Sequence, residues 1–340
     1  MFIPIVNKPS DTLRPSSSGI SANDWAVLAN FWYPVAIAAQ IGSEPVAVKL
    51  LDVELVLYRC TEGRVTAALD ACPHRHVRLS AGTVVDGEII CPFHGLRFNG
   101  AGRCTHVPAL GPRSNLPPSY RVRTFEVRER HGLMWTCIGD NPAADLPSLP
   151  LMSQTAIEEL NYLNPEIWPV SAARQVENFI DIAHLPYVHA ATLGGDQAAP
   201  IKPGRIEQQA DSVVMRANYI ETSHGVRHCT YTYRVVLPFA IEFKVEVDDD
   251  PDFLLESCDL PSPISAHQCK VFQILRYRGT LEDREGLARG LAAVNQEDIV
   301  VLSAMTVPDL PLDQHHEIHL PVDNISNAYR GRLRDLGLGR

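Results

Sequence analysis

Two short motifs that combine cysteine and histidine lie close together in the first third of the chain. The motif CPH occupies residues 72–74, and CPFHG follows at residues 91–95. Two thiolates and two imidazoles on two loops suit a tetrahedral zinc ion, or a [2Fe–2S] cluster in which histidines replace the cysteines on one iron. These residue types therefore indicate a metal centre with the ligands Cys72, His74, Cys91 and His94.

The spacing of these four residues favours the iron–sulfur cluster. Zinc knuckles usually place two or more residues between paired ligands, whereas Cys-x-His followed by Cys-x-x-His-Gly, with proline after each cysteine, resembles the Rieske signature. His76 is an alternative to His74, but Cys-x-His is the Rieske spacing. Val77 and Phe93 stand where respiratory and photosynthetic Rieske proteins have two further cysteines. Phe93 also cannot donate a hydroxyl hydrogen bond, which favours the low-potential cluster of oxygenases and ferredoxins.

A second set of candidate ligands lies further along the chain, in the segment ENFIDIAHLPYVH. Asn178, Asp181 and His184 follow one another at intervals of three, so a helix would line them along one face. Pro186 would then disturb the helix and re-aim His189. Two histidines held in this way can bind one ion and leave coordination positions open.

The third ligand of this site is expected to be a carboxylate. We assign it to Asp298 in the segment NQEDIVV, which completes the two-histidine, one-carboxylate face of Fe(II) oxygenases. Glu297 is the neighbouring alternative, because the sequence does not show which carboxylate of an adjacent pair turns inward. An ordinary surface helix is the other interpretation of this stretch. O₂ and a substrate need the vacant side of such a site, so the pattern predicts a mononuclear Fe(II) centre.

Short strands predominate in the region that carries the cysteine motifs. Between residues 46 and 139 the sequence reads as strands joined at glycine, asparagine and aspartate, which predicts an all-β unit. The stretch 140–150 is rich in proline, aspartate and alanine and looks like a linker, so we place a domain boundary there. We expect a leader over residues 1–22 and a cluster-binding domain over residues 23–148.

The rest of the chain, residues 149–340, is expected to form the domain that carries the iron. It contains a helical segment around residues 174–183, alternating strand-like segments between 212 and 278, and helices over 283–305 and 324–336. This order predicts an antiparallel sheet covered by helices, of the helix-grip or START-like type. The chain as a whole is therefore expected to be α+β.

These segments together carry a family resemblance. ENFIDIAHLPYVH after a Rieske motif, with QEDIVVL and the terminal AYRGRLRDL, resembles the Rieske non-haem iron aromatic oxygenases, in the subgroup of vanillate and dicamba O-demethylases and purine N-demethylases. Leu96 departs from the family, where many members have an aromatic residue, and this bears on packing near the cluster. The resemblance implies a terminal oxygenase that uses O₂ to hydroxylate or oxidatively demethylate a small aromatic or heterocyclic substrate. Electrons would come from a ferredoxin or flavin reductase, so NAD(P)H acts only indirectly.

The resemblance also implies a homotrimer, in which the cluster of one subunit passes electrons to the iron of its neighbour through an aspartate that matches Asp181. A carboxylate three residues before His184 can accept its ring N–H while it reaches a cluster histidine, here His94, across an interface. Asn178 is assigned with Asp181 to the catalytic group. The alternative for Asp181 is a simple charge on a helix surface.

The overall composition limits the partners. Thirty Lys and Arg residues against forty Asp and Glu residues give a net charge of −10, which argues against a nucleic acid or an anionic membrane surface as partner. The N-terminal sequence lacks the charged and apolar regions of a signal peptide, and no apolar run reaches the roughly 20 residues of a membrane span. We therefore expect a soluble cytoplasmic protein whose eight cysteines are reduced or bind metal.

Two other functions compete with this interpretation. A Rieske electron-transfer protein is disfavoured because a carrier has no use for an open ferrous site. An arene cis-dihydroxylating dioxygenase is disfavoured because such enzymes typically have a longer catalytic chain and a separate small subunit. We expect a neutral planar substrate in a pocket between the sheet and the iron-binding helix. Its lining is expected from strands such as 238–247 and 272–277, although the sequence does not show which of their side chains point inward. These segments offer Phe239, Phe243, Phe272 and Tyr277 for stacking, with Lys244 and Arg276 as the exceptions to a lack of basic groups.

Overall fold

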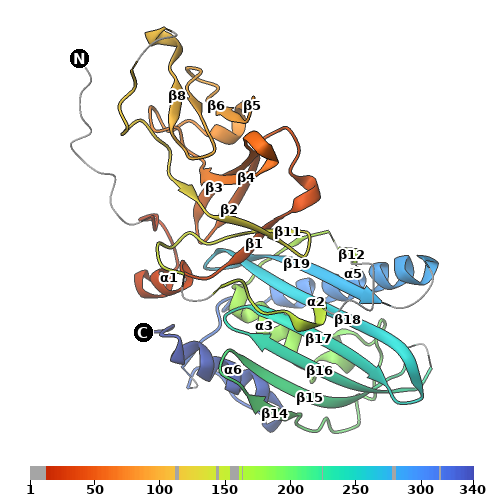
Figure 1. Cartoon of the computed structure of the whole chain (residues 1–340). Coiled ribbons are helices and arrows are strands. Elements are labelled where there is room, and N and C mark those ends of the chain that lie inside the picture. Colours follow the sequence, from red (N-terminus) through yellow and green to blue (C-terminus); the bar gives the residue numbers. More distant parts are fainter. Residues whose placement is uncertain are drawn as a thin grey trace. The chain divides into compact units, whose positions relative to one another are not determined.

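The computed structural model describes residues 13–111, 115–142, 145–153, 161–162, 164–223, 225–277, 281–313 and 315–340 (Figure 1). The chain forms two compact units. One comprises Met1–Ser18 and Ala29–Leu146, and the other Gly19–Leu28 and Pro147–Arg340. Residues 1–12, which make up most of the expected leader, lie outside the described part of the chain.

The first unit consists of three small antiparallel sheets. Their strand orders are β1-β11-β10, β2-β3-β4-β9 and β5-β6-β7-β8. The bounds are β1 Tyr33–Ile37, β2 Val46–Leu50, β3 Val53–Arg59, β4 Val65–Leu69, β5 Thr83–Val85, β6 Glu88–Ile90, β7 Arg97–Phe98, β8 Cys104–His106, β9 Thr124–Phe125, β10 Val127–Arg130 and β11 Leu133–Thr136. The all-β character expected for this region is confirmed.

The hydrophobic core of this unit reaches the two cysteine motifs. Strand β3 has the continuous apolar run LVLY, which is typical of a strand buried on both faces. Val56 and Tyr58 of this strand pack in one buried cluster with Phe98. Cys72 and Cys91 belong to the same cluster, so the loops that carry the motifs rest on the core rather than extending freely into solvent.

The second unit is built around one large antiparallel sheet. Its strand order is β12-β19-β18-β17-β16-β15-β14, and β13 also pairs with β19. The strands are β12 Asn161–Tyr162, β13 Glu166–Trp168, β14 Arg205–Gln208, β15 Ser212–Glu221, β16 Arg227–Val236, β17 Ala240–Val247, β18 Asp250–Ser265 and β19 Gln268–Tyr277. The helices are α1 Ala22–Leu28, α2 Pro150–Ser153, α3 Ala172–Ile180, α4 Leu185–Val188, α5 Leu281–Ser303 and α6 Asn324–Asp335.

Alternating side chains explain how this sheet acquires a buried face. In β16, Cys229, Tyr231, Tyr233 and Val235 are buried and the residues between them are more exposed, as expected for a strand covered on one side. Helix α3 contacts β18 and β19, and α6 contacts β14 and β15. An antiparallel sheet covered by helices is therefore confirmed, and with it the α+β class.

Among the described residues, no helix has both the length and the hydropathy needed to cross a membrane.

Candidate metal centres

The two cysteine loops repeat one backbone turn. The amide of Cys72 donates to Val77 O at 2.9 Å, and Cys72 O accepts from the amide of His76 at 2.8 Å. The amide of Cys91 likewise donates to Leu96 O at 2.9 Å, and Cys91 O accepts from the amide of Gly95 at 3.0 Å. His76 and Gly95 close the two turns with positive φ of 58° and 69°. His76 is therefore the structural counterpart of Gly95, a turn-closing residue, which argues against it as the ligand.

The four candidate cluster ligands divide into a buried pair and an exposed pair. Cys72 and Cys91 are 1% and 2% exposed, whereas His74 and His94 lie at the surface. The two imidazole rings are adjacent, with centroids 4.6 Å apart. A cluster held between these loops would therefore have its thiolate-bound iron inside and its imidazole-bound iron at the surface, which is the division of ligands that a Rieske cluster requires.

The protonation of these groups also fits a metal cluster. Burial raises the pKa of the Cys72 thiol to about 11, against hydrogen bonds from the backbone that lower it. A thiolate therefore needs a bound cation to be stable here at neutral pH. Burial and the neighbouring His94 lower the pKa of His74, so this imidazole is neutral and able to coordinate. Leu96, where the family usually has an aromatic residue, packs in the core beneath the loop.

Asn178, Asp181 and His184 do not lie along one helix, although the sequence analysis expected that they would. Helix α3 begins at Ala172 after the N-cap Ser171, whose hydroxyl accepts from Arg174 N, and it ends at Ile180 because Asp181 takes an extended conformation with ψ of 128°. The Asp181 carboxylate accepts the amides of Ala183 at 2.9 Å and His184 at 3.2 Å. Local hydrogen bonding by an aspartate side chain thus replaces the next helical turn.

Pro186 also acts differently from the expectation. It lies in the first turn of helix α4, where proline is well tolerated because its missing N–H would have no partner within the helix. Helix α4 carries His189 at its C-terminal end. The proline therefore helps to start a new helix rather than disturbing the previous one.

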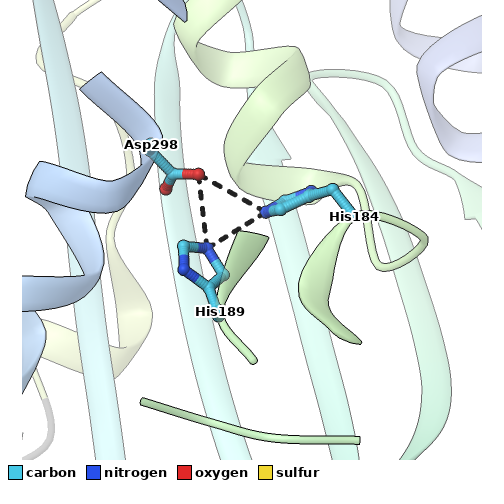
Figure 2. A group of neighbouring side chains, drawn as sticks. All are labelled: His184, His189 and Asp298. Carbon is cyan, nitrogen blue, oxygen red and sulfur yellow. Dashed lines mark hydrogen bonds and ion pairs between the residues drawn. The ribbon is translucent and has the colours of Figure 1, made fainter. Parts of the chain in front are cut away.

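His184 and His189, at the two ends of α4, converge with Asp298 of α5, which lies more than a hundred residues further along the chain (Figure 2). The Nε2 atoms of the two histidines are 3.2 Å apart. Asp298 Oδ1 on α5 lies 3.5 Å from His184 Nε2 and 3.2 Å from His189 Nε2. Ligands at roughly 2.1 Å from one metal ion and about 90° apart would be separated by about 3 Å, so these atoms are spaced as one face of a coordination sphere.

Hydrogen bonds behind the rings determine which nitrogen faces the centre. His184 Nδ1 lies 2.9 Å from Asp181 Oδ2, and His189 Nδ1 lies 2.8 Å from Glu297 Oε2. Each Nδ1–H therefore donates to a carboxylate, which leaves a lone pair on each Nε2. Two such lone pairs and a carboxylate oxygen repel one another at these distances unless a cation lies between them. The donor set therefore fits a metal ion.

The field of the carboxylates favours positive charge at this point. Burial acts to lower the pKa of His189, yet the Asp298 and Glu297 carboxylates together raise it above its ordinary value. For Asp181, burial acts to raise the pKa, and the hydrogen bonds and charge of His184 lower it below its ordinary value. Glu297, the alternative third ligand, instead lies behind His189 and also accepts from Thr192 Oγ1 at 2.7 Å.

A cavity of about 100 Å³ opens beside these three side chains. Helix α5 lines it with a stripe at i, i+3, i+4 and i+7 that ends in Asp298, and Glu297 is outside this stripe. The opposite wall is aromatic. It contains Phe179, Tyr231, Tyr233 and Phe243, with the rings of Tyr233 and Phe243 4.7 Å apart. Asn178 also lines the cavity, and its buried Nδ2 has no hydrogen-bond partner among the described residues.

Both strand segments expected to line the pocket do so, but of the aromatic and basic side chains named in them only one lines this cavity. Phe243 does, but Gln273 and Leu275 are the residues of β19 that face it, so Phe272 and Arg276 lie on the other face of the strand. Arg276 is 1% exposed and pairs with Glu256 at 3.0 Å. The assignments of Phe272 and Arg276 to the pocket were therefore wrong.

The three other pocket assignments were wrong as well. Phe239 lies in a different hollow, beside Leu333 of α6. Tyr277 contacts Phe253 instead, and Lys244 pairs with Glu246 at 2.9 Å. The tyrosines that do line the cavity were missed, although the alternation in HCTYTYRVV is a signal that could have identified them.

Two family models match the chain. The Rieske [2Fe-2S] domain matches residues 31–126, and the vanillate O-demethylase oxygenase C-terminal domain matches residues 168–338. Methylxanthine N1-demethylase NdmA of Pseudomonas putida is 30% identical over 321 residues, 91% of this chain and 89% of its own. The oxygenase component of dicamba O-demethylase of Stenotrophomonas maltophilia is 36% identical over 176 residues, 49% of each chain. The structure of Pseudomonas putida NdmA with caffeine superposes with a TM-score of 0.82 at 26% identity, covering 92% of each chain.

Proposed function

The chain belongs to the Rieske non-haem iron oxygenases with a vanillate O-demethylase type C-terminal domain, and on this premise we propose that it hydroxylates or oxidatively O- or N-demethylates a small aromatic or heterocyclic substrate. It is an oxidoreductase with a [2Fe–2S] cluster and a mononuclear iron. The observation that carries the proposal is the His184, His189 and Asp298 face, which opens on an aromatic-lined cavity. An electron carrier needs neither the face nor the cavity.

The proposed cluster ligands are Cys72, His74, Cys91 and His94. Buried thiols and adjacent exposed imidazoles support this assignment. The cluster would deliver single electrons, and the exposed histidine edge is where they can leave or enter the chain. Cys72 and Cys91 would hold the cluster, and both belong to the hydrophobic core of the first unit.

The proposed iron ligands are His184, His189 and Asp298. When bound, the iron supplies the activation of O₂ that no amino-acid side chain can provide. Asp181 and Glu297 would act as positioning residues, since each holds the Nδ1–H of one histidine and so fixes its tautomer and ring orientation. Asn178 would contact the substrate, because its unpartnered Nδ2 lines the same cavity.

We further propose a homotrimer in which Asp181 links the iron of one subunit to His94 of the next. The support is that Asp181 is partly exposed, although it already holds His184, so one edge of its carboxylate remains accessible to a further donor. The relatives are named as parts of larger systems, such as the oxygenase component of dicamba O-demethylase. A ferredoxin or flavin reductase is accordingly the proposed electron donor.

Monooxygenation is proposed over cis-dihydroxylation because the similar proteins are named as N- and O-demethylases. The cavity favours a neutral planar molecule. Its walls are mostly aromatic and aliphatic, and the polar side chains outside the iron face are three amides, Glu221 and Ser257. Lys244 and Arg276, which could have bound a carboxylate, face elsewhere. A substrate of this kind would stack on Tyr233 and Phe243 and present the oxidised group to the iron face.

Reconstitution tests this function directly. The purified chain should contain about three irons, two in the cluster and one mononuclear, and show a Rieske-type electron paramagnetic resonance signal when reduced. With a ferredoxin and reductase, methylated heterocycles and methoxyarenes are screened for substrate-dependent O₂ uptake with stoichiometric formaldehyde. His184→Ala should lose the mononuclear iron and turnover but keep the cluster signal. The control His228→Ala, at an exposed position of β16, should keep the mononuclear iron, the turnover and the cluster signal. Zinc in place of iron, or a cis-diol as main product, would contradict the proposal.

A further inference from the structure

One wall of the cavity is polar and is made by two side-chain amides. Gln273 on β19 and Asn295 on α5 both line the cavity, and each is 8% exposed. Behind them lies Asp259 on β18, which is fully buried and stands opposite Gln273 in the strand register. Because the three residues come from three elements, their hydrogen bonds fix the orientation of the amides relative to the cavity.

Asp259 determines which way the Gln273 amide points. Above the pKa of about 7 to which burial raises it, this carboxylate is ionised and can only accept hydrogen bonds. Gln273 Nε2 donates to Asp259 Oδ1 at 2.6 Å, and Gln175 Nε2 donates to Asp259 Oδ2 at 2.9 Å. Gln175 keeps this orientation although its buried Oε1 then has no partner among the described residues. The carboxylate therefore dominates the local arrangement, and Gln273 Oε1 is directed away from it.

All four amide N–H groups of the wall are used within the protein. The second N–H of Gln273 is directed at Asn295 Oδ1 at 3.4 Å. Asn295 Nδ2 donates to Gln273 Oε1 at 2.7 Å and to Glu166 Oε2 at 3.3 Å. Each amide oxygen accepts one hydrogen bond and has a second lone pair available. What remains for a bound molecule is therefore acceptor capacity only.

We propose that the Gln273–Asn295 wall selects substrates that direct an N–H or O–H donor at it, such as phenols, azoles or lactams. This inference rests on the proposed function, since it narrows the substrate class of the same site. A molecule that offers only acceptors to this wall would face two amide oxygens and lose its hydrogen bonds to water without replacement. Asn178 Nδ2 adds an unpartnered donor elsewhere in the cavity, so a substrate acceptor is complementary there.

Indole and benzofuran test this polarity, because they have nearly the same shape and only indole carries an N–H. Neither offers a ring-nitrogen lone pair to the iron. Dissociation constants are measured calorimetrically on the iron-loaded full chain at pH 8, above the pKa of about 7 to which burial raises Asp259. Indole should bind roughly two- to tenfold more tightly than benzofuran, the effect of one net hydrogen bond.

Gln273→Leu should remove this preference by weakening indole and leaving benzofuran nearly unchanged. Gln296→Leu is the matched control and should keep the preference. Gln296 also donates to Glu166, at 2.6 Å, but it is exposed and is not among the described residues that line the cavity. If circular dichroism shows that Gln273→Leu is misfolded, Asn295→Ala takes its place, and it should likewise remove the preference for indole.

Equal affinity of the two probes for the unmodified chain, or an equal change of both in the variants, would overturn the proposal. A greater loss of benzofuran than of indole would show that the wall donates. The measurement involves no turnover. If the chain takes up no mononuclear iron but still binds indole preferentially, the proposed function is contradicted. The proposal about the Gln273–Asn295 wall is then still supported.

Discussion

Asp259 makes the stability of the protein depend on pH in a direction opposite to that of most acids. Complete burial raises its pKa from the ordinary 3.8 to about 7, while the amides of Gln175 and Gln273 act to lower it. The folded state therefore holds a proton that the unfolded chain has already lost between these two values. The sign follows directly, because stability falls with rising pH wherever the folded state binds more protons.

The magnitude can be worked from the two pKa values. The two pKa values differ by about three units, which at 1.36 kcal/mol each amounts to about 4 kcal/mol. The free energy of unfolding is lowered by this full amount only above pH 7. Between pH 5 and pH 8 the change from this one group is about 2.5 kcal/mol. Asp259→Asn removes the titration, so the free energy of unfolding of the variant minus that of the unmodified chain should rise by about this amount over the same interval.

Urea denaturation followed by circular dichroism at several pH values between 5 and 8 measures this difference. Subtracting the free energies of unfolding of the two chains cancels the contributions of the other titrating groups, which both chains share. Asp249→Asn, an exposed acid in the turn between β17 and β18, is the matched control and should give a difference that does not vary with pH. Parallel curves for Asp259→Asn and the unmodified chain would refute the argument that Asp259 is buried without a compensating positive charge.

Three further substitutions test separate parts of the structure. Asp181→Asn should retain both metals but slow electron delivery from a pre-reduced cluster by roughly 10- to 100-fold in a single turnover, because His184 loses the charge that orients it; a normal rate would reject the bridging role. Arg330→Met should cost about 2–3 kcal/mol in urea denaturation, since Glu177 and Glu317, at 2.7 and 2.5 Å from this guanidinium, are then left to share the single guanidinium of Arg174; a loss under about 1 kcal/mol would contradict this. Gly95→Ala should bleach the cluster at a lower temperature, because φ is +69° and a Cβ would lie 3.0 Å from a proline ring; unchanged bleaching would show that the turn adapts.

The candidate ligands could be proposed from the sequence because most of the groups concerned are nearly contiguous. Cys72 and His74 lie on one loop, and the two histidines of the iron site lie five residues apart. Short spacing restricts the geometry strongly whatever the tertiary fold. The third ligand was harder, since Asp298 and Glu297 are neighbours on a helix and only the position of α5 over the cavity separates their roles.

The end of α3 could not be placed correctly from periodicity. The spacing of Asn178, Asp181 and His184 is compatible with a helix, and the run has no glycine to mark a stop. The helix ends because the Asp181 side chain takes up backbone amides two and three residues ahead, a competition between side chain and backbone that periodicity does not register. The same carboxylate then holds His184, so the break in the helix is itself part of the site.

The strands that line the pocket could be predicted, but the side chains that enter it could not, because they depend on which face of each strand turns inward. A strand presents alternate residues to opposite faces, so an error of one position exchanges the whole set. That is what separates Phe272 and Arg276 from Gln273 and Leu275 on β19. The sequence shows that both sets are compatible with burial, and only the position of α5 over one face of the sheet decides between them.

This contrast separates the proposed metal ligands of this chain from the residues that would select its substrate. The cysteine and histidine candidates lie in short motifs and Asp298 comes from α5, so none of the proposed ligands lies on the strands that line the cavity. The polar wall is non-local, because Gln273, Asn295 and Asp259 come from two strands and a helix and orient one another only in the folded unit. Substitution at these positions can change which molecule is held without moving an iron ligand. The chemistry of the site is therefore legible in two motifs, and its selectivity resides in hydrogen bonds among residues that no local pattern brings together.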